Sequence, residues 1–236
     1  MDTHYLNETV DIHKFFRAYR SHPPGGWWFR GQADISWPLL PKAGRPENFL
    51  PDNRDLGRFS HWRFSAAAYF DSLPQNDWEC LAMAQHHGLA TRLLDWTSNP
   101  LVALYFACCE HNDVDGAVYL YDPDRFVKED ALPLDATVVG VAYIPRAIAP
   151  RILNQKGAFT LHGPPTAEIE DKPHMIWTEH SNLARLGIRK EQKPEILTML
   201  NDYGVNQVSL FPDLDGLSNH INWETRLMVK PSGPNA

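Results

Sequence analysis

The chain has 236 residues, of which 43% are hydrophobic and 22% charged, with a formal net charge of −7 and three cysteines. The acidic balance argues against broad, non-specific nucleic-acid binding, which needs a basic surface, and three cysteines do not make a disulfide framework. The N-terminal residues lack the features of a signal peptide, and no apolar run approaches the roughly 20 residues that span a bilayer. We therefore expect a cytoplasmic protein with no membrane partner.

The first part of the chain predicts three helices, one strand and one ordered loop. The helices are expected over residues 8–20, 55–70 and 76–87, the strand over 27–31, and the Pro-rich loop over 36–53. Asn7 is a suitable N-cap for the first helix, and Gly88 is a suitable residue to end the third.

A second group of elements follows Gly88. A strand over 91–96 leads into a helix with Asn99 as N-cap and Pro100 at its first position. Further strands are expected over 116–122, 136–144, 157–163 and 205–211, with a helix over 193–204. Helices that come first and then alternate with strands favour an α+β or mixed α/β fold. We expect a single domain over 1–236, with its core at about 8–228 and a flexible tail at 229–236.

Arg30 stands at the end of the aromatic strand, next to Gly31. A guanidinium there is suited to clamp a phosphate or carboxylate through two parallel hydrogen bonds, and Gly31 would let a ligand approach the backbone closely. In the alternative interpretation, Arg30 stacks on Trp28 or pairs with Asp34.

His86 and His87 fall in the last turn of the third helix, where the helix dipole favours a protonated imidazole. Consecutive residues of a helix point in different directions, so the two cannot bind one metal ion together in the usual manner. No Cys or His set has the spacing of a zinc site, and we expect no metal. Two interpretations of the pair stay open: one histidine faces a cleft, or both make structural hydrogen bonds.

The strand that carries Asp95, Thr97 and Ser98 runs directly into the N-terminus of a helix. The free N–H groups of a first helical turn, together with two hydroxyls, suit an anionic or polyhydroxyl ligand. The alternative is that Thr97, Ser98 or Asn99 only caps the helix. The two roles are compatible at one junction.

The remaining polar candidates lie late in the chain. Gln155 can donate and accept hydrogen bonds but is a poor acid or base. Asp213 and Asp215 follow a Pro, in a pattern that is also typical of a plain helix start. The chain has no GxGxxG after a strand, no phosphate-binding GxxxxGK[ST], no GxSxG and no HExxH motif.

Several separated segments together resemble the FRG domain family, which takes its name from the Phe-Arg-Gly found here at Phe29–Gly31. The segments are "WWFRGQADISWPLLPKAGR", "QHHGLATRLLDWTSNPLVALYFACCE", "DGAVYLYDP", "RILNQKGAFTLHG" and "VSLFPDLDGLS". The resemblance runs from about Trp27 to Leu217. It implies a bacterial or phage-borne protein of unassigned activity. Some members of the family lie near defence or toxin genes.

The layout also resembles the ADP-ribosyltransferase fold, which implies a mixed, mainly antiparallel split β-sheet flanked by helices. The resemblance implies that Arg30, Gly31 and Gln32 hold NAD as a substrate. It implies further that Thr91, Thr97 and Ser98 line the pocket, with "NPLVALYFA" as the helix that follows. His87 would contact the ribose or the nicotinamide side.

The position of the catalytic Glu in that fold corresponds to Gln155 here. A glutamine cannot stabilise an oxocarbenium-like transition state with negative charge. Either another acid supplies that charge, or the chain binds a nucleotide without transferring ADP-ribose. The candidate acids are Asp95, Asp213, Asp215 and Glu168.

Three functions follow from these patterns. The first is an NAD-dependent ADP-ribosyltransferase-like enzyme, a toxin or defence effector that acts on a protein or nucleic-acid acceptor. The second is a non-catalytic module that senses a nucleotide or binds a partner protein. The third is a metal-dependent nuclease or other hydrolase that uses the His and Asp residues.

Overall fold

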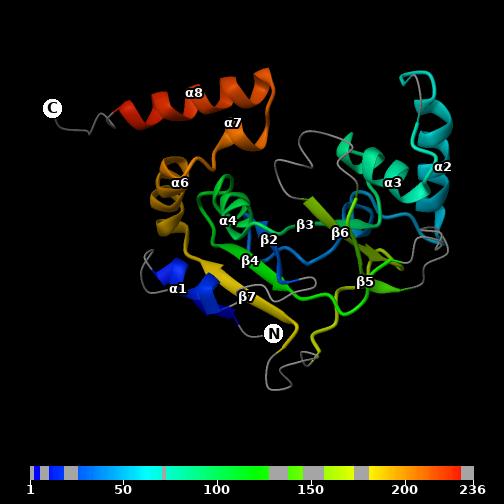
Figure 1. Cartoon of the computed structure of the whole chain (residues 1–236), viewed down its shortest axis with the longest axis horizontal. Helices are drawn as coiled ribbons and strands as arrows, with labels where there is room; N and C mark the ends of the chain where they lie inside the picture. Colours follow the sequence, from blue (N-terminus) through cyan, green and yellow to red (C-terminus); the bar gives the residue numbers. More distant parts are fainter. Residues whose placement is uncertain are drawn as a thin grey trace.

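The computed structural model describes residues 3–5, 11–18, 26–70, 73–127, 138–145, 157–172 and 181–229. One seven-stranded sheet, in the order β1-β7-β4-β2-β3-β6-β5, forms its centre (Figure 1). The strands are β1 (Thr3–Tyr5), β2 (Trp28–Gln32), β3 (Leu93–Thr97), β4 (Gly116–Tyr121), β5 (Val139–Tyr143), β6 (Gly157–His162) and β7 (Leu183–Ile188). β1 and β7 are parallel, and all other neighbours are antiparallel. The predicted α+β class with a mixed, mainly antiparallel sheet is confirmed.

The described helices flank this sheet. They are α1 (Asp11–Ala18), α2 (Arg54–Ala66), α3 (Asp77–His86), α4 (Pro100–Cys108), α6 (Lys193–Asp202), α7 (Gln207–Leu210) and α8 (Leu214–Met228), with 3-10 turns at Lys42–Gly44 and Lys190–Gln192. The predicted cap of α4 is confirmed: Asn99 Oδ1 accepts from the main-chain N–H of Leu101 at 3.0 Å, and Pro100 opens the helix. Gly88 follows α3 with a φ of +91°, a conformation that favours glycine.

The strand register sorts side chains onto two faces of the sheet. Phe29 lies opposite Thr97, and Leu93 opposite Leu161, so these four project from the same face. On that face α4 and α6 cover β2, β4 and β7, whereas α2 and α3 cover β3 and β6. The other face carries a second apolar cluster that includes Trp28, Leu94, Trp96 and Tyr121. The two helical groups, α4 with α6 and α2 with α3, therefore border the central strands β2 and β3 from opposite sides.

The sheet is nearly divided where β2 meets β3. β2 pairs with β4 over five residues and β3 pairs with β6 over five, but β2 and β3 share the single pair Phe29–Thr97. The seven strands nonetheless form one sheet, so the prediction of a sheet split into two parts is wrong. Beyond Phe29, the edges of β2 and β3 separate, and side chains rather than main-chain bonds join them.

One further prediction failed, and one strand was not predicted at all. Residues 205–211 were expected to form a strand, but they contain the short helix α7. There Asn206 Oδ1 accepts from the N–H of Ser209 at 3.1 Å, and Ser209 Oγ accepts from the N–H of Asn206 at 3.0 Å. This reciprocal capping outweighs the β propensity of Val205 and Val208. The sequence also gave no sign of β7, whose Ala, Arg and Gly have low β propensity and which pairing with β4 and β1 holds in place.

Some predictions fall on residues outside the described ranges. They are the cap at Asn7, the polar residue Gln155, and all of the tail after Val229. Within the described ranges, no helix has both the length and the apolar character needed to cross a membrane.

Candidate functional site

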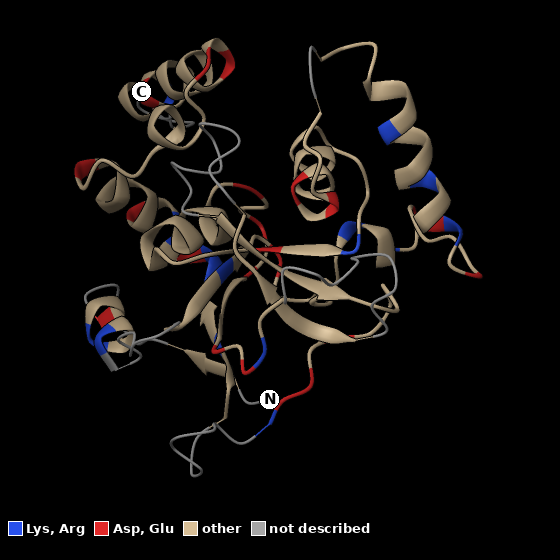
Figure 2. Cartoon of the chain, turned by 45° about the vertical axis from the view of Figure 1, so that its right-hand side comes forward, with Lys and Arg blue, Asp and Glu red and all other residues tan. Residues whose placement is uncertain are grey.

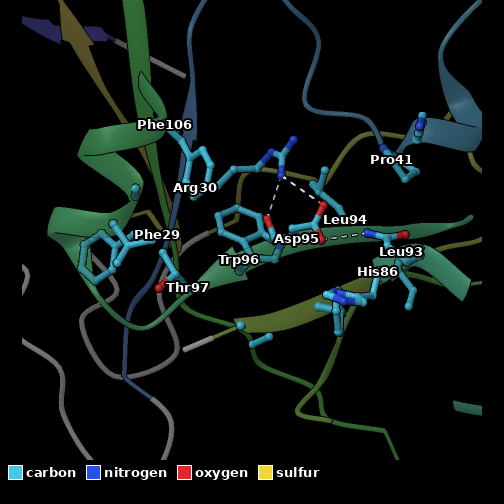
Figure 3. Close-up of a pocket in the computed structure, with 18 of the residues that line it drawn as sticks. Phe29, Arg30, Pro41, His86, Leu93, Leu94, Asp95, Trp96, Thr97 and Phe106 are labelled. Atoms are coloured by element: carbon cyan, nitrogen blue, oxygen red, sulfur yellow. Dashed lines mark hydrogen bonds and ion pairs between the residues drawn. The ribbon is translucent and has the colours of Figure 1, made fainter. Parts of the chain in front are cut away.

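A cleft of about 390 Å³ lies over the separated edges of β2 and β3. Residues of β2, β3 and β6, the last turn of α3 and its following loop, one face of α4, and the loop at 41–45 line it. Figure 3 shows Arg30 and Asp95 facing each other within it, with Phe106 on the side of α4. The volume falls within the range of roughly 300–1,000 Å³ that is common for small-molecule sites.

Arg30 crosses the gap between the two strands. Its Nη1 donates to the main-chain oxygen of Asp95 at 2.9 Å. The side chain is 13% exposed, and its buried Nε has no hydrogen-bond partner among the described residues. Burial lowers the pKa of the guanidinium, and the Asp95 carboxylate opposes this shift, but an arginine remains charged. Arg30 is a fixed cation at the floor of the cleft.

Asp95 is the carboxylate of the cleft. Its side chain is 62% exposed although its strand neighbours are buried, because it lies between the two helical groups. Oδ1 accepts from Gln85 Nε2 at 2.9 Å, and Oδ2 lies 3.8 Å from Arg30 Nη1. No other acidic residue is among the described residues that line the cleft.

Two further cations come from the loop that borders the cleft. Lys42 Nζ donates to the main-chain oxygen of Gly88 at 3.0 Å, and the half-buried Arg45 lies close enough to lower the pKa of Arg30. The N–H of the buried Ala43 donates to the oxygen of Thr91 at 3.1 Å, which holds the loop against β3. Arg30, Lys42 and Arg45 together place three positive charges against one negative charge in the lining.

This local excess of positive charge contrasts with the chain as a whole, whose net charge is −7. Figure 2 shows basic and acidic positions distributed over many elements rather than separated into two halves. A positive concave site with low-dielectric walls attracts anions more strongly than an exposed surface does. The cleft therefore favours an anionic ligand.

Gly31 has a different role from the one predicted. A Cβ on this residue would lie 1.9 Å from the main-chain oxygen of Ala103 and 2.6 Å from the nitrogen of Ala107. The close approach that the glycine permits is that of α4 to β2. Gly31 lines the cleft, but the space above it belongs to the helix backbone, not to a ligand.

Gln32 is buried beyond the cleft. Its Nε2 donates to the oxygen of Pro38 at 3.3 Å, and it does not line the main cavity. Together with Arg30 and Gly31 it lines a second cavity that adjoins the cleft, so its contact with a ligand stays a prediction. Its amide secures the start of the loop that follows β2.

His86, rather than His87, faces the cleft. His87 is exposed, and its ring contacts that of Phe70 edge-on at a centroid distance of 5.6 Å. Of the two alternatives left open for the pair, a cleft-facing histidine fits His86, whereas His87, to which the resemblance gave the ligand contact, lies outside the lining. Adjacent helical positions differ by about 100° in direction, and the sequence did not fix which of the two turns inward.

At the strand-to-helix junction, Thr97 belongs to the wall of the cleft, whereas Asn99 caps α4. Thr97 is buried in the lining of the cleft, and its Oγ1 accepts from the N–H of Asn99 at 3.0 Å. Ser98 is exposed and does not line the cavity. Thr91 is also outside the lining of the cleft; its hydroxyl bonds to Gln85, so it reaches the site through that residue.

The other candidate acids lie away from the cleft. Asp213 caps α8, where its Oδ1 accepts from the N–H of Gly216 at 2.7 Å, and Asp215 lies in the first turn of that helix. Glu168 is exposed and is not part of the lining. Gln155 lies outside the described residues. Of the acids weighed from sequence, Asp95 is the one that the structure brings to Arg30.

A buried polar chain runs beneath the cleft. Trp96 Nε1 donates to Thr160 Oγ1 at 2.9 Å, and Thr160 Oγ1 lies 3.2 Å from His162 Nε2. His162 Nδ1 lies 2.8 Å from the oxygen of Ala167, which can only accept, so the neutral ring carries its proton on Nδ1. Nε2 then accepts from the hydroxyl of Thr160. Burial lowers the pKa of His162 to about 4, and the charge of Arg30 adds to this effect.

Sequence reasoning missed three residues of the site: Lys42, Arg45 and Gln85. Their positions depend on how the loop at 41–45 and the end of α3 cross β3, which no local pattern reveals. Within the described ranges, no group of three or more His, Cys, Asp or Glu side chains is placed to hold a metal ion.

Comparison with known proteins identifies one family. Residues 25–116 match the family model described as the FRG domain. The match begins just before β2 and ends at the first residue of β4, so it contains Arg30, Lys42, Arg45, Gln85 and Asp95. No curated protein and no solved structure matches the chain.

Proposed function

We propose, for a chain that carries an FRG domain over residues 25–116, that the cleft binds an anionic nucleotide and that NAD is its substrate. The observation that carries this proposal is the convergence of Arg30, Lys42 and Arg45 on one cleft of an acidic protein. Guanidinium groups bind phosphate through paired, charge-assisted hydrogen bonds. The cleft also has apolar and aromatic walls, as nucleotide bases and sugars require; these include Trp96, Phe106 and Phe159.

The reaction proposed is transfer of ADP-ribose. The bond between the ribose C1′ and the nicotinamide nitrogen breaks, and neutral nicotinamide leaves with the bonding electrons. A nucleophile of the acceptor forms the new bond to C1′, and its proton passes to a base or to water. In this proposal Arg30 and Arg45 hold the pyrophosphate, and Asp95 faces the positive charge that develops on the ribose.

Asp95 supports this role because its two oxygens differ in their surroundings. Oδ1 is bonded to Gln85, and Oδ2 has only the long approach of Arg30 Nη1 at 3.8 Å among the described residues. The carboxylate is exposed to the cleft, where a substrate can reach it. An aspartate here can supply the negative charge that Gln155 cannot.

The first test is nicotinamide release combined with thermal stability. We expect millimolar NAD to raise the Tm of the wild type, and Arg30→Ala to abolish the shift. Arg226→Ala, an exposed arginine of α8 outside this cleft, should retain it. The absence of any NAD-dependent rise in Tm, together with the absence of nicotinamide release on every acceptor tried, would show the proposal to be wrong.

A non-catalytic nucleotide sensor is the second candidate. It is favoured by the fact that Gln85 and Arg30 already share the charge of Asp95. In that case NAD or a related nucleotide raises the Tm, Asp95→Asn retains the effect, and no nicotinamide is released. The same two measurements therefore separate the enzyme from the sensor.

A further inference from the structure

We propose that Gln85 is a positioning residue for Asp95, and that Thr91 holds Gln85 in place. The three side chains form a directed relay that ends at the carboxylate of the cleft. Its effect on turnover rests on the function proposed above, but its effect on the conformation of Asp95 does not.

The relay begins at the main chain of β3. The N–H of Leu93 donates to Thr91 Oγ1 at 3.1 Å, so a lone pair of this hydroxyl is already engaged. The hydroxyl proton is then directed to Gln85 Oε1, with which Thr91 forms a hydrogen bond. The Asp95 carboxylate can only accept, so it fixes Gln85 Nε2 on its own side and leaves Oε1 to accept from Thr91.

The other end of the same amide faces the cleft. With Oε1 held by Thr91, Gln85 Nε2 points to Asp95 and donates to Oδ1 at 2.9 Å. The carboxylate therefore sets the orientation of the amide, and the buried Thr91 hydroxyl holds its other end in place without a ligand.

The relay gives Asp95 one conformation. An aspartate that is 62% exposed would otherwise be free to change rotamer, because Arg30 binds its main-chain oxygen at 2.9 Å and approaches its carboxylate only at 3.8 Å. Gln85 fixes Oδ1, and this leaves Oδ2 toward Arg30 and the cleft. A reacting group that is already held in place avoids the entropy loss of ordering it at each turnover.

Other basic side chains line the same cleft but do not replace this bond. They are Arg30 from β2, His86 from α3, and Lys42 and Arg45 from the adjoining loop. Among the described residues, Gln85 is the one whose side chain is within hydrogen-bond distance of the Asp95 carboxylate.

The decisive experiment measures the χ1 rotamer of Asp95 by NMR three-bond couplings, without ligand. We expect one rotamer in the wild type and in Thr91→Ser, which keeps the hydroxyl. Rotamer averaging is expected in Gln85→Leu and Thr91→Val, which keep the size of the side chain but lose its hydrogen bonds. Gln75→Leu, at an exposed glutamine before α3, is the matched control and should show one rotamer. Averaging in the wild type, or one rotamer in Gln85→Leu, overturns the proposal.

Nicotinamide release then tests the consequence. Misplacing a reacting group costs on the order of 100-fold in rate, so we expect Gln85→Leu and Thr91→Val to lower kcat by about 10- to 100-fold, with a much smaller change in KM. Thr91→Ser should restore kcat. An unchanged kcat in Gln85→Leu refutes the catalytic consequence of positioning. If the wild type releases no nicotinamide, the proposed transfer fails, and the rotamer measurement alone decides the relay.

Discussion

Two arginine–aspartate pairs, both involving residues of the segment 92–95, differ in how completely their hydrogen bonds are satisfied. Arg92 donates to both oxygens of Asp55, from Nε at 2.6 Å and from Nη2 at 2.9 Å, and the side chains are 6% and 3% exposed. Arg30 approaches the Asp95 carboxylate at 3.8 Å, and Asp95 is 62% exposed. The same residue types thus make a closed structural pair in one place and an open, ligand-accessible pair in the other.

The difference follows from the neighbouring elements. Asp55 belongs to α2, which packs directly on β3 and β6 and seals the Arg92 pair from water. The Arg30 pair lies where β2 and β3 separate and where the two helical groups leave a gap. A carboxylate paired with arginine is therefore a poor indicator of function until its remaining hydrogen bonds are examined.

The largest expected effect is a loss of stability when the closed Arg92–Asp55 pair is broken. Arg92→Ala leaves the charge of Asp55 buried without its partner, and removing one member of a buried pair costs about 3–5 kcal/mol. We expect a loss of this size in the free energy of unfolding, measured by urea denaturation. Arg30→Ala should cost clearly less; equal losses for the two variants would remove the distinction between the pairs.

The buried chain beneath the cleft gives a pH-dependent effect. The pKa of His162 falls from 6.5 when unfolded to about 4 when folded, so below pH 6.5 the unfolded state binds the proton more strongly. The stability that the neutral ring contributes is complete above pH 6.5 and is lost as the pH falls to about 4, by up to about 3 kcal/mol. Urea denaturation at pH 7, 5.5 and 4 measures it. His162→Gln, which does not titrate, should reduce the slope; identical slopes would contradict the assignment.

A smaller effect is expected on NAD binding in the cleft that holds the open Arg30–Asp95 pair. The Arg45 side chain contributes charge to the cleft without a hydrogen bond or ion pair to any described residue, so replacing it should leave the main-chain bonds of the loop intact. We expect Arg45→Ala to weaken NAD binding about tenfold, equivalent to about 1.4 kcal/mol, with the difference shrinking as salt screens the cleft. Titration calorimetry at low and high salt measures both. A full loss of stability in this variant would show that Arg45 is structural.

The smallest effect concerns Asp213, which sequence reasoning placed among the catalytic candidates. As the N-cap of α8 it stabilises that helix, and replacing such a cap by alanine costs about 1 kcal/mol. We expect Asp213→Ala to lower the unfolding free energy by this amount and to leave NAD affinity unchanged. A loss of NAD affinity in Asp213→Ala would show that Asp213 contributes to the binding site.

The sequence predicted well those features that depend on neighbouring residues. Asn99 and Pro100 marked the start of α4, and Arg30, Asp95 and Thr97 were recognised at strand ends that do meet in the cleft. Contacts between distant segments were not predictable. The loop at 41–45 brings Lys42 and Arg45 to the site only because it packs on β3.

The same reason accounts for the errors. The choice between His86 and His87 depends on the rotation of α3, and the role of Gly31 depends on how closely α4 approaches β2. β7 is a strand because β4 and β1 pair with it, not because of its own residues. Each of these features depends on packing between elements that are distant in the chain, and local patterns in one sequence do not predict such packing.

The most direct test of the open pair is a calorimetric titration of NAD into the wild type and Arg30→Ala, with Arg92→Lys as a variant of the closed pair. The account predicts saturable binding to the wild type and to folded Arg92→Lys, and its loss in folded Arg30→Ala. Equal NAD binding by the wild type and Arg30→Ala, or no binding by the wild type, would contradict it.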